Sequence, residues 1–561
     1  MGDMYKKEYE RWLVNVTDKD LHTELESMSD AAIEDAFYRD LAFGTGGLRG
    51  TIGAGTNRMN VYVVAKASQG LANYLLKTVD EPSVVIGYDS RIKSDVFART
   101  AASVFSANGI TVHLWPELNP VPTVSYAIRY LQASAGVMVT ASHNPSKYNG
   151  YKVYGADGCQ ITTEAAAEIL GQIEALDIFA DVKCLDFDKA VDAGTIRYIE
   201  SAVMDSYIAE VKKQSVLFGD DVNRDVAIVY SPLNGTGLKP VTRVLSESGF
   251  TNITVVEEQR NPDGKFPTCP YPNPEIREAM ELGLKYAADT GADLLLATDP
   301  DADRCGIAVR TAGDYQLLSG NEVGLLLLDF ICSQRIRHNR MPQFPVFIKT
   351  IVTMDLAEKI AEHYGCQTIN VLTGFKFIGE QIGYLEAGGR EADYICGFEE
   401  SYGYLTGSYV RDKDAVNAAF MICEMFAYYK MQNVSLLEKL EEIYNTYGYC
   451  LNTLHSYEFP GSAGMEKMNE IMKSFHAGID SVAGMQVART EDYSKGLNGL
   501  PKSDVLKFFF DGGNESGSVV IRPSGTEPKL KAYISIRANN RNNAINTEET
   551  ISNEIKERLG I

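Results

Sequence analysis

Two short polar segments of this chain hold residue types that are suited to phosphoryl transfer. Residues 140–145, with the sequence TASHNP, place the hydroxyl of Ser142 directly after an apolar run. Residues 299–304, with the sequence DPDADR, place three carboxylates at alternate positions. A serine hydroxyl can carry a phosphoryl group between two half-reactions, and close carboxylates suit a hard cation such as Mg²⁺. The two segments therefore predict a centre in which a cation neutralises the charge of the transferred group.

Each segment also allows plainer interpretations. Ser142 beside His143 is compatible with a hydrolase, although no separate Asp-His-Ser arrangement is evident, or with a turn that closes a strand. The acidic segment starts like an EF-hand, but Arg304 and Arg310 stand where that loop needs glycine and glutamate. A solvated acidic turn is the other alternative. Three close carboxylates repel one another, and a bound cation relieves that repulsion.

Other polar segments offer contacts for a phosphate or a sugar. Lys152 could move protons if its pKa is lowered, or it could be a surface lysine. Glu399 and Ser401 suit vicinal sugar hydroxyls, and the segment that begins at Arg522 (RPSGTEP) could cradle an oxyanion or form an ordinary turn. The further candidates are Arg49, in the glycine-rich segment GTGGLRG, then Arg304, Thr373, Gly374, Lys376, Lys413, Ser524, Gly525 and Thr526.

The same organisation occurs three times along the chain. Apolar runs that read as buried strands alternate with helical stretches and end in polar loops, which predicts mostly parallel α/β sheets with ligands at the carboxyl ends of the strands. We expect strands at 84–87, 135–139, 227–230, 293–297, 346–348 and 394–396, and helices at 95–108, 239–249 and 354–364.

The two ends of the chain differ from this pattern. Residues 1–40 are expected to form a helical extension. A linker is expected at 459–464, followed by a helix that buries Met465, Met468, Met472 and Phe475, by strands at 505–510, 519–522 and 532–536, and by a helix at 548–559. The prediction is therefore α/β: three similar mixed or parallel sandwich domains, 1–205, 206–322 and 323–456, and a C-terminal α+β domain, 457–561.

Composition narrows the class of partner. The formal charge of −22 argues against nucleic acids and anionic membranes, which need basic surface. The nine scattered cysteines are odd in number and form no CxxC pair, which favours a reducing compartment. The N-terminal residues lack the apolar core of a signal peptide. We therefore expect a cytoplasmic protein, a monomer or a small homo-oligomer, that acts on a small molecule.

Four motifs in this order resemble those of the α-D-phosphohexomutase superfamily, which includes phosphoglucomutases, phosphomannomutases and phosphopentomutases. They are TASHNP at Ser142, DPDADR at Asp299, GFEES around Glu399 and RPSGTEP at Arg522. The resemblance covers nearly the whole chain. The TGFK segment at 373–376 and the N-terminal extension are most similar to the branch that holds bacterial phosphoglucomutases and animal phosphopentomutase.

The resemblance implies four domains around a central cleft and a phosphorylated Ser142. It also implies Mg²⁺ bound by Ser142 and the three aspartates, proton transfer by Arg49 and Lys152 with His143 among the catalytic residues, sugar binding at Glu399 and Ser401, and phosphate binding at Arg522, Ser524, Gly525 and Thr526. The expected reaction interconverts glucose 1-phosphate and glucose 6-phosphate, with a hexose 1,6-bisphosphate as intermediate and activator.

Two departures and several rival functions stay open at this stage. Gly46 stands where many relatives carry serine or alanine, and Tyr402-Gly403-Tyr404 replaces a segment that contains histidine in dual-specificity enzymes. The rivals are a phosphopentomutase, a phosphomannomutase, a phosphotransferase that makes hexose bisphosphate, and a phosphosugar sensor without catalysis. The preferred sugar, the oligomeric state and the regulation do not follow from the sequence.

Overall fold

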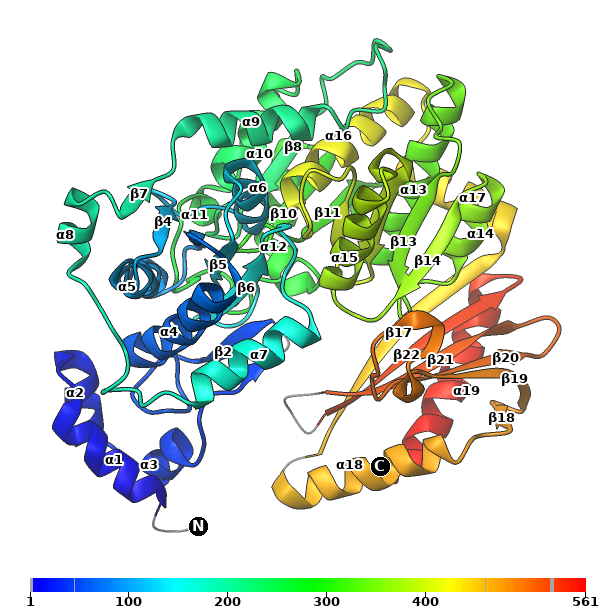
Figure 1. Ribbon diagram of the computed structural model, residues 1–561. Helices are drawn as coiled ribbons and strands as arrows, with labels where there is room; N and C mark the ends of the chain where they lie inside the picture. Colours follow the sequence, from blue (N-terminus) through cyan, green and yellow to red (C-terminus); the bar gives the residue numbers. More distant parts are fainter. Residues whose placement is uncertain (1–3, 45, 460, 525–528) are drawn as a thin grey trace. The chain divides into compact units, whose positions relative to one another are not determined.

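The computed structural model describes residues 4–561 except 45, 460 and 525–528, and it divides into two compact units that interleave along the chain (Figure 1). The first unit comprises Met1–Leu318, Phe375–Tyr394 and Tyr402–Ala427, and the second comprises Ser319–Gly374, Ile395–Ser401 and Tyr428–Ile561. In the described part of the chain, no helix is both long and apolar enough to cross a bilayer.

The first unit contains a seven-stranded sheet. Strands β3, β4, β5 and β7 are parallel, and β6, β2 and β1 continue the sheet in antiparallel fashion. In sheet order the strands are β1 (Phe43–Gly44), β2 (Gly47–Thr51), β6 (Tyr148–Gly155), β5 (Ala135–Val139), β3 (Ser83–Tyr88), β4 (Thr111–Leu114) and β7 (Ile196–Tyr198). Its helices are α4 (Val61–Thr78), α5 (Ser94–Ala107), α6 (Val121–Leu131), α7 (Thr163–Glu174), α8 (Phe187–Asp192) and α9 (Ser201–Lys212).

The expected N-terminal helical extension consists of α1 (Met4–Asn15), α2 (Lys19–Glu26) and α3 (Asp30–Phe37), which lie together in Figure 1. Trp12 is fully buried and joins the same hydrophobic core as the α4 side chains. The extension is therefore part of the packing of the first sheet.

A five-stranded sheet completes the strand–helix pattern of the first unit. Its order is β12 (Tyr315–Leu318), β11 (Cys305–Arg310), β10 (Leu294–Thr298), β8 (Ile228–Ser231) and β9 (Ile253–Val255), with β8, β9 and β10 parallel. All five residues of β10 are buried, as expected for a strand covered on both faces. The helices of this part are α10 (Leu238–Glu247), α11 (Glu257–Arg260) and α12 (Arg277–Thr290). The first unit also includes α15 (Phe375–Ala387), the short strand β16 (Gly403–Leu405) and most of α16 (Ala415–Met431).

The second unit combines a third sheet, which contains a parallel pair of strands, with the C-terminal sheet. The third sheet contains β14 (Gln367–Val371), β13 (Val346–Thr350) and β15 (Tyr394–Glu399), in that order, with α13 (Gly320–Arg337), α14 (Leu356–His363) and α17 (Leu436–Tyr447). Helices α13 and α17 begin at capping boxes, Ser319 with Glu322 and Ser435 with Glu438. These boxes satisfy backbone N–H groups that a helix leaves unpaired.

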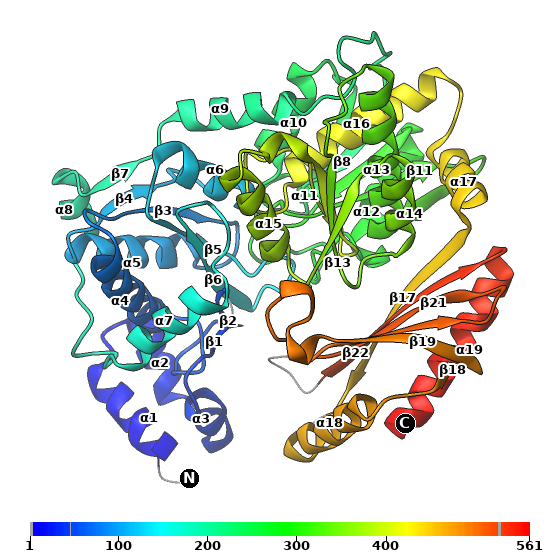
Figure 2. The same ribbon diagram turned by 45° about the vertical axis from the view of Figure 1, so that its right-hand side comes forward.

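The C-terminal sheet is antiparallel throughout. Its order is β17 (Tyr449–Glu458), β22 (Lys529–Ala538), β21 (Ser516–Pro523), β20 (Leu506–Asp511), β19 (Met485–Asp492) and β18 (Ser481–Val482). Helices α18 (Gly461–His476) and α19 (Arg541–Leu559) share one hydrophobic core with it and lie on the same side of the sheet in Figures 1 and 2.

The fold class is confirmed, with two local corrections. Residues 461–464 were expected in a linker but form the first turn of α18, and β17 already belongs to the C-terminal sheet. Met468, Met472 and Phe475 are buried as predicted, whereas Met465 is 41% exposed because it lies near the start of α18, off the face that meets the sheet. The domain boundaries near 205, 322 and 456 and the central cleft stay predictions.

Candidate active site

Ser142 lies in the loop between β5 and β6, and its backbone conformation is unusual. Its φ is +51°, in the left-handed region that non-glycine residues rarely adopt, and the side chain is buried. The backbone N–H of Ser142 donates a 2.8 Å hydrogen bond to the hydroxyl of Thr140. Such a conformation persists only where surrounding contacts hold it.

Arg91, which follows β3, supplies most of those contacts. It donates hydrogen bonds to the backbone carbonyls of Ser142, Asn144 and Pro145 in this loop, and to that of Tyr148 at the start of β6. Its side chain is fully buried and lies 3.4 Å from the Asp89 carboxylate, which is also fully buried. Both residues follow the strand expected at 84–87, and nothing in their local sequence indicates this role.

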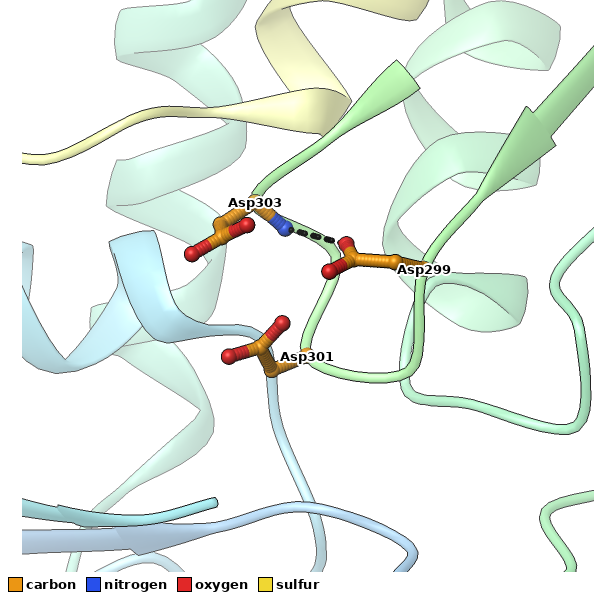
Figure 3. Close-up of side chains that lie close together, drawn as sticks. All are labelled: Asp299, Asp301 and Asp303. Carbon is orange, nitrogen blue, oxygen red and sulfur yellow. Dashed lines mark hydrogen bonds between the residues drawn. The ribbon is translucent and has the colours of Figure 1, made fainter. Parts of the chain in front are cut away.

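The three aspartates occupy the turn between β10 and β11 and lie close together in Figure 3. Each offers a carboxylate oxygen, and these oxygens lie within 4.8 Å of one another. Asp299 Oδ1 accepts the backbone N–H groups of Asp303, at 3.1 Å, and Arg304, at 3.0 Å. These bonds fold the turn so that alternate side chains converge on one point.

The donor set fits a cation. Asp301 Oδ1 and Asp303 Oδ1 are buried and accept no hydrogen bond, which is costly for a carboxylate oxygen unless another positive partner is present. Burial and the charges of Asp301 and Asp303 raise the pKa of Asp299 well above its usual range. A cation among the three oxygens would satisfy the unpaired atoms and relieve this repulsion.

The serine hydroxyl and the acidic turn meet directly. Ser142 Oγ donates to Asp299 Oδ2 at 2.8 Å, and Thr140 Oγ1 lies 3.1 Å from Asp301 Oδ2. His143 Nδ1 also lies 3.1 Å from Ser142 Oγ, and burial together with the Arg304 charge lowers the pKa of His143 well below its usual value. Among the hydrogen bonds of the described residues, none joins a carboxylate to His143. The hydrolase interpretation therefore lacks the group that would orient the histidine.

Two lysines face the acidic turn. Lys152 Nζ, from β6, lies 3.0 Å from Asp301 and 3.4 Å from Asp303, and Lys413 Nζ lies 3.0 Å from Asp303. Proton transfer by Lys152 was expected only if its pKa is lowered. Burial does act in that direction, but the two carboxylates outweigh it and the pKa is raised. Lys413 was predicted as a phosphate contact, and here it also forms ion pairs with Asp303 and Asp412.

Arg49 and Lys152 emerge from the same face of the first sheet. Arg49 on β2 is directly opposite Gly150 on β6. Gly150 is two positions from Lys152, and side chains alternate between faces along a strand, so Arg49 and Lys152 share a face.

Packing explains why position 46 is a glycine. A Cβ there would lie 2.4 Å from the Gln160 amide nitrogen, which donates a 3.0 Å hydrogen bond to the Gly46 carbonyl. Arg304, at the end of the acidic turn, forms an ion pair with Glu275 and lies 3.8 Å from Asp303.

In the second unit, two of the predicted substrate-binding segments meet. Glu399 ends β15, is 5% exposed, and accepts a 2.9 Å hydrogen bond from the backbone N–H of Gly374. Thr373 precedes Gly374, and its hydroxyl is buried without a hydrogen bond. Ser401 follows two residues after Glu399 and is partly exposed. An unsatisfied hydroxyl next to a carboxylate suits a polyhydroxylated ligand.

Arg522 lies near the end of β21 and Ser524 directly follows that strand, in the same unit. Arg522 hydrogen-bonds the phenol of Tyr533, whose pKa burial and the Glu400 charge raise to about 12. Gly525 and Thr526 lie outside the described residues. Lys376 is the second residue of α15 in the first unit, and burial lowers its pKa to about 8.

A buried serine, an acidic turn with unpaired oxygens and several cationic side chains on one α/β framework define an enzyme of the phosphoryl-transfer class. Family comparisons agree with this class. The three profiles for phosphoglucomutase/phosphomannomutase α/β/α domains I, II and III match residues 40–178, 205–313 and 319–447. The chain therefore belongs to the phosphoglucomutase/phosphomannomutase family, whose enzymes are mutases, and it is an isomerase of that kind.

Individual relatives support the same assignment. The chain is 36% identical over 542 residues to a phosphoglucomutase of Staphylococcus saprophyticus, covering 94% of this chain and 96% of that one. It is 35% identical to a phosphoglucomutase of Staphylococcus aureus, with 96% and 97% covered. The solved structure of parafusin, a phosphoglucomutase from Paramecium, shares the fold with a TM-score of 0.69 at 18% identity, covering 93% of this chain and 95% of that chain.

Proposed function

We propose that this protein interconverts glucose 1-phosphate and glucose 6-phosphate through phosphoserine at Ser142 and a glucose 1,6-bisphosphate intermediate. The contact that carries the proposal is the 2.8 Å hydrogen bond between Ser142 Oγ and Asp299 Oδ2, because it joins a nucleophilic oxygen to a cluster suited to a cation. The relatives at 35–36% identity are phosphoglucomutases, which favours glucose over mannose or pentose phosphates.

The proposed reaction has two balanced halves. A free hydroxyl oxygen of the sugar monophosphate attacks phosphorus, the bond from phosphorus to Ser142 Oγ breaks, and the hydroxyl proton is released. The resulting bisphosphate reorients, its other phosphoryl group returns to Ser142 Oγ, and a proton returns to the freed sugar oxygen. Mg²⁺ held by Asp299, Asp301 and Asp303 would neutralise charge on the transferred group.

The described residues support separate tasks in this scheme. Lys152 and Arg49 share a sheet face and can bind phosphoryl oxygens or relay protons, while Arg304 adds a third positive charge. Glu399 and Ser401 are proposed to bind sugar hydroxyls, and Arg522 and Ser524 to bind the phosphate that is not reacting. Charged hydrogen bonds of this kind give both affinity and orientation.

A direct assay tests the proposal. Purified protein, Mg²⁺ and a trace of glucose 1,6-bisphosphate should convert glucose 1-phosphate into glucose 6-phosphate. The kcat/KM should be higher than with mannose 1-phosphate or ribose 1-phosphate. A higher value for ribose 1-phosphate would reassign the substrate to a pentose, and no conversion of any of the three would contradict mutase activity.

The phosphate role of Arg522 has its own test. Because a mutase presents each end of the sugar to one serine, the same distal clamp must hold both monophosphates. Arg522→Ala should raise the KM for glucose 1-phosphate and for glucose 6-phosphate roughly ten- to a hundredfold, as expected for the loss of a charged hydrogen bond. A defect with only one of the two substrates would contradict a shared clamp.

A further inference from the structure

The C-terminal sheet has one face covered by helices and another that carries polar groups. Leu506, Phe508 and Phe510 of β20 enter the core with α18 and α19. The alternate positions point to the opposite face, and strand register aligns Lys507 with Val520 and Val520 with Tyr533. Ser518 and Arg522, two residues either side of Val520, share this polar face. The proposed phosphate-binding arginine therefore stands on the same face as a buried lysine.

Two side chains of the polar face converge on one carboxylate, that of Asp355. Lys507 Nζ lies 2.7 Å from Asp355 Oδ1, and Ser518 Oγ donates to Oδ2 at 2.6 Å. Lys507 also donates to the Ile351 carbonyl at 2.9 Å. Asp355 stands at the start of α14, just after the loop by which the chain leaves β13. Both oxygens of this carboxylate thus connect the third sheet to the C-terminal sheet.

A second lysine, Lys349, also contacts this segment. Lys349, the fourth residue of β13, is fully buried, lies 3.5 Å from Asp355 Oδ1 and 3.1 Å from Glu358 Oε1, and donates to the Thr353 carbonyl at 3.1 Å. Burial would raise the pKa of Asp355, but Lys507 and Lys349 outweigh it and hold the pKa below its usual range. Asp355 is therefore charged, and its position is determined by partners on two sheets.

The loop that ends at Asp355 also reaches the proposed sugar-binding segment. The hydroxyls of Thr350 and Thr353 each donate to Glu400 Oε2 at 3.4 Å. Glu400 is the immediate neighbour of Glu399, and its charge raises the pKa of Tyr533, which hydrogen-bonds Arg522. The short segment 350–355, which starts at the last residue of β13, therefore contacts Glu400 through its threonines and the C-terminal sheet through Asp355.

We propose that Asp355 is a positioning residue for the distal phosphate. Through Lys507 and Ser518 it fixes the face that carries Arg522 at a set separation from the Glu399 loop, so that sugar and phosphate are recognised as one rigid pattern. Buried ion pairs contribute little net stability compared with apolar groups, but they can specify one arrangement of the elements that they join. This inference rests on the proposed function and adds to it a group that touches no substrate.

Graded variants test the role. Ser518→Ala removes one hydrogen bond to Asp355 and keeps the ion pair, so the protein should fold. Lys507→Met removes the charge, and Lys507→Arg restores it. We expect the KM for glucose 1-phosphate to rise severalfold in Ser518→Ala and at least about tenfold in Lys507→Met, with kcat changed less than threefold and partial recovery in Lys507→Arg.

The matched control lies on α14, the helix that begins after Asp355. Lys359→Met removes an exposed ion pair with Glu362 on α14 and should leave KM unchanged. A purely structural role for Asp355 predicts a lower midpoint of thermal unfolding with the wild-type KM in the folded fraction. The proposal would be overturned if folded Ser518→Ala and Lys507→Arg both had the wild-type KM for glucose 1-phosphate, while Lys507→Met had either the wild-type KM or one that cannot be measured.

A binding measurement separates this inference from the proposed function. If the wild-type protein fails to turn over glucose 1-phosphate, the proposed function fails. Calorimetric titration of glucose 1-phosphate into wild type and Ser518→Ala then tests the positioning role alone. Weaker binding by the variant supports it, and equal binding or no binding by either protein overturns it.

Discussion

Ser142 Oγ and Asp299 Oδ2 are 2.8 Å apart, although 157 positions separate the two residues in the chain. One comes from the exit of β5 in the seven-stranded sheet and the other from the exit of β10 in the five-stranded sheet. Both loops leave the carboxyl end of a buried strand, where α/β folds collect functional groups. The contact therefore unites the two segments that carry the chemistry.

Ser142 is expected to carry the phosphoryl group. Ser142→Ala should lose essentially all turnover, because no other step of the proposed cycle can store a phosphoryl group between the two half-reactions. Peptide mass spectrometry of the active wild-type protein should show about 80 Da added to the peptide that contains Ser142. Ser146→Ala, in the same loop, is the control and should stay active. Near-wild-type turnover by Ser142→Ala would refute the phosphoserine mechanism.

Cation binding should depend on Asp301. Asp301→Asn should reduce kcat about a hundredfold or more, because a bound cation contributes several kcal/mol to stabilising transition-state charge. Metal analysis should show less bound Mg²⁺ than in wild type, and chelation should abolish wild-type activity until Mg²⁺ is restored. The control Asp314→Asn, on an exposed turn, should retain metal and activity. Full activity after exhaustive chelation would count against a metal role.

Arg91 should matter for stability and for catalysis. Arg91→Met leaves the buried Asp89 carboxylate without its ion pair and removes the guanidinium donor from four carbonyls, so we expect the free energy of unfolding in urea to fall by about 3–5 kcal/mol. Arg91→Lys keeps the charge but cannot span the four carbonyls, so kcat should drop at least about tenfold in folded protein. Arg99→Met, which removes an exposed pair with Asp188, should change stability by less than about 0.5 kcal/mol. Normal kcat in Arg91→Lys would show that the loop holds its shape without the guanidinium.

Glu424 should make stability depend on pH. This carboxyl on α16 is 2% exposed, and one oxygen accepts a 2.7 Å hydrogen bond from Ser215 while the other has none. Burial raises its pKa from 4.5 to about 7. Between these values the folded state binds more protons at Glu424 than the unfolded state, so the contribution of Glu424 to stability is fully present below pH 4.5 and is lost as pH rises towards 7, by up to about 1.4 kcal/mol per pH unit.

Glu424→Gln removes this titration. Urea unfolding should therefore show a stability advantage of the variant over wild type that grows from pH 5 to pH 7 and is constant above it. Glu441→Gln, an exposed position on α17, serves as the control and should track wild type. A difference between Glu424→Gln and wild type that does not vary with pH would exclude the titration of Glu424 as its cause.

Local patterns were enough to find the strands and the two loops of the centre. The run that ends before Ser142 and the run that ends before Asp299 are both continuous and apolar, and each structural strand is fully buried. Alternate carboxylates at 299, 301 and 303 marked a cation site because few other arrangements tolerate them. These signals lie within a few neighbouring residues, which is why sequence reasoning detects them.

Contacts between distant single residues were not predictable in the same way. Arg91, Lys507 and Asp355 each look like an ordinary charged residue, and their importance comes from partners that packing places beside them. Lys152 shows the same limit: its position was noted, but the direction of its pKa shift depends on Asp301 and Asp303. The burial of Met465 was predicted wrongly, because the spacing of apolar residues along a helix does not show at which turn the helix stops contacting the sheet.

The interleaving of the two units has a consequence for biosynthesis. The first unit takes up Tyr402–Ala427 after the chain has already contributed Ser319–Gly374 to the second. A nascent chain that ends at Leu318 contains Ser142 and all three aspartates, but not Lys413, which neutralises Asp303. The ribosome must therefore add about a hundred further residues, on the order of 5–20 s of elongation, before the charge balance of the centre is complete.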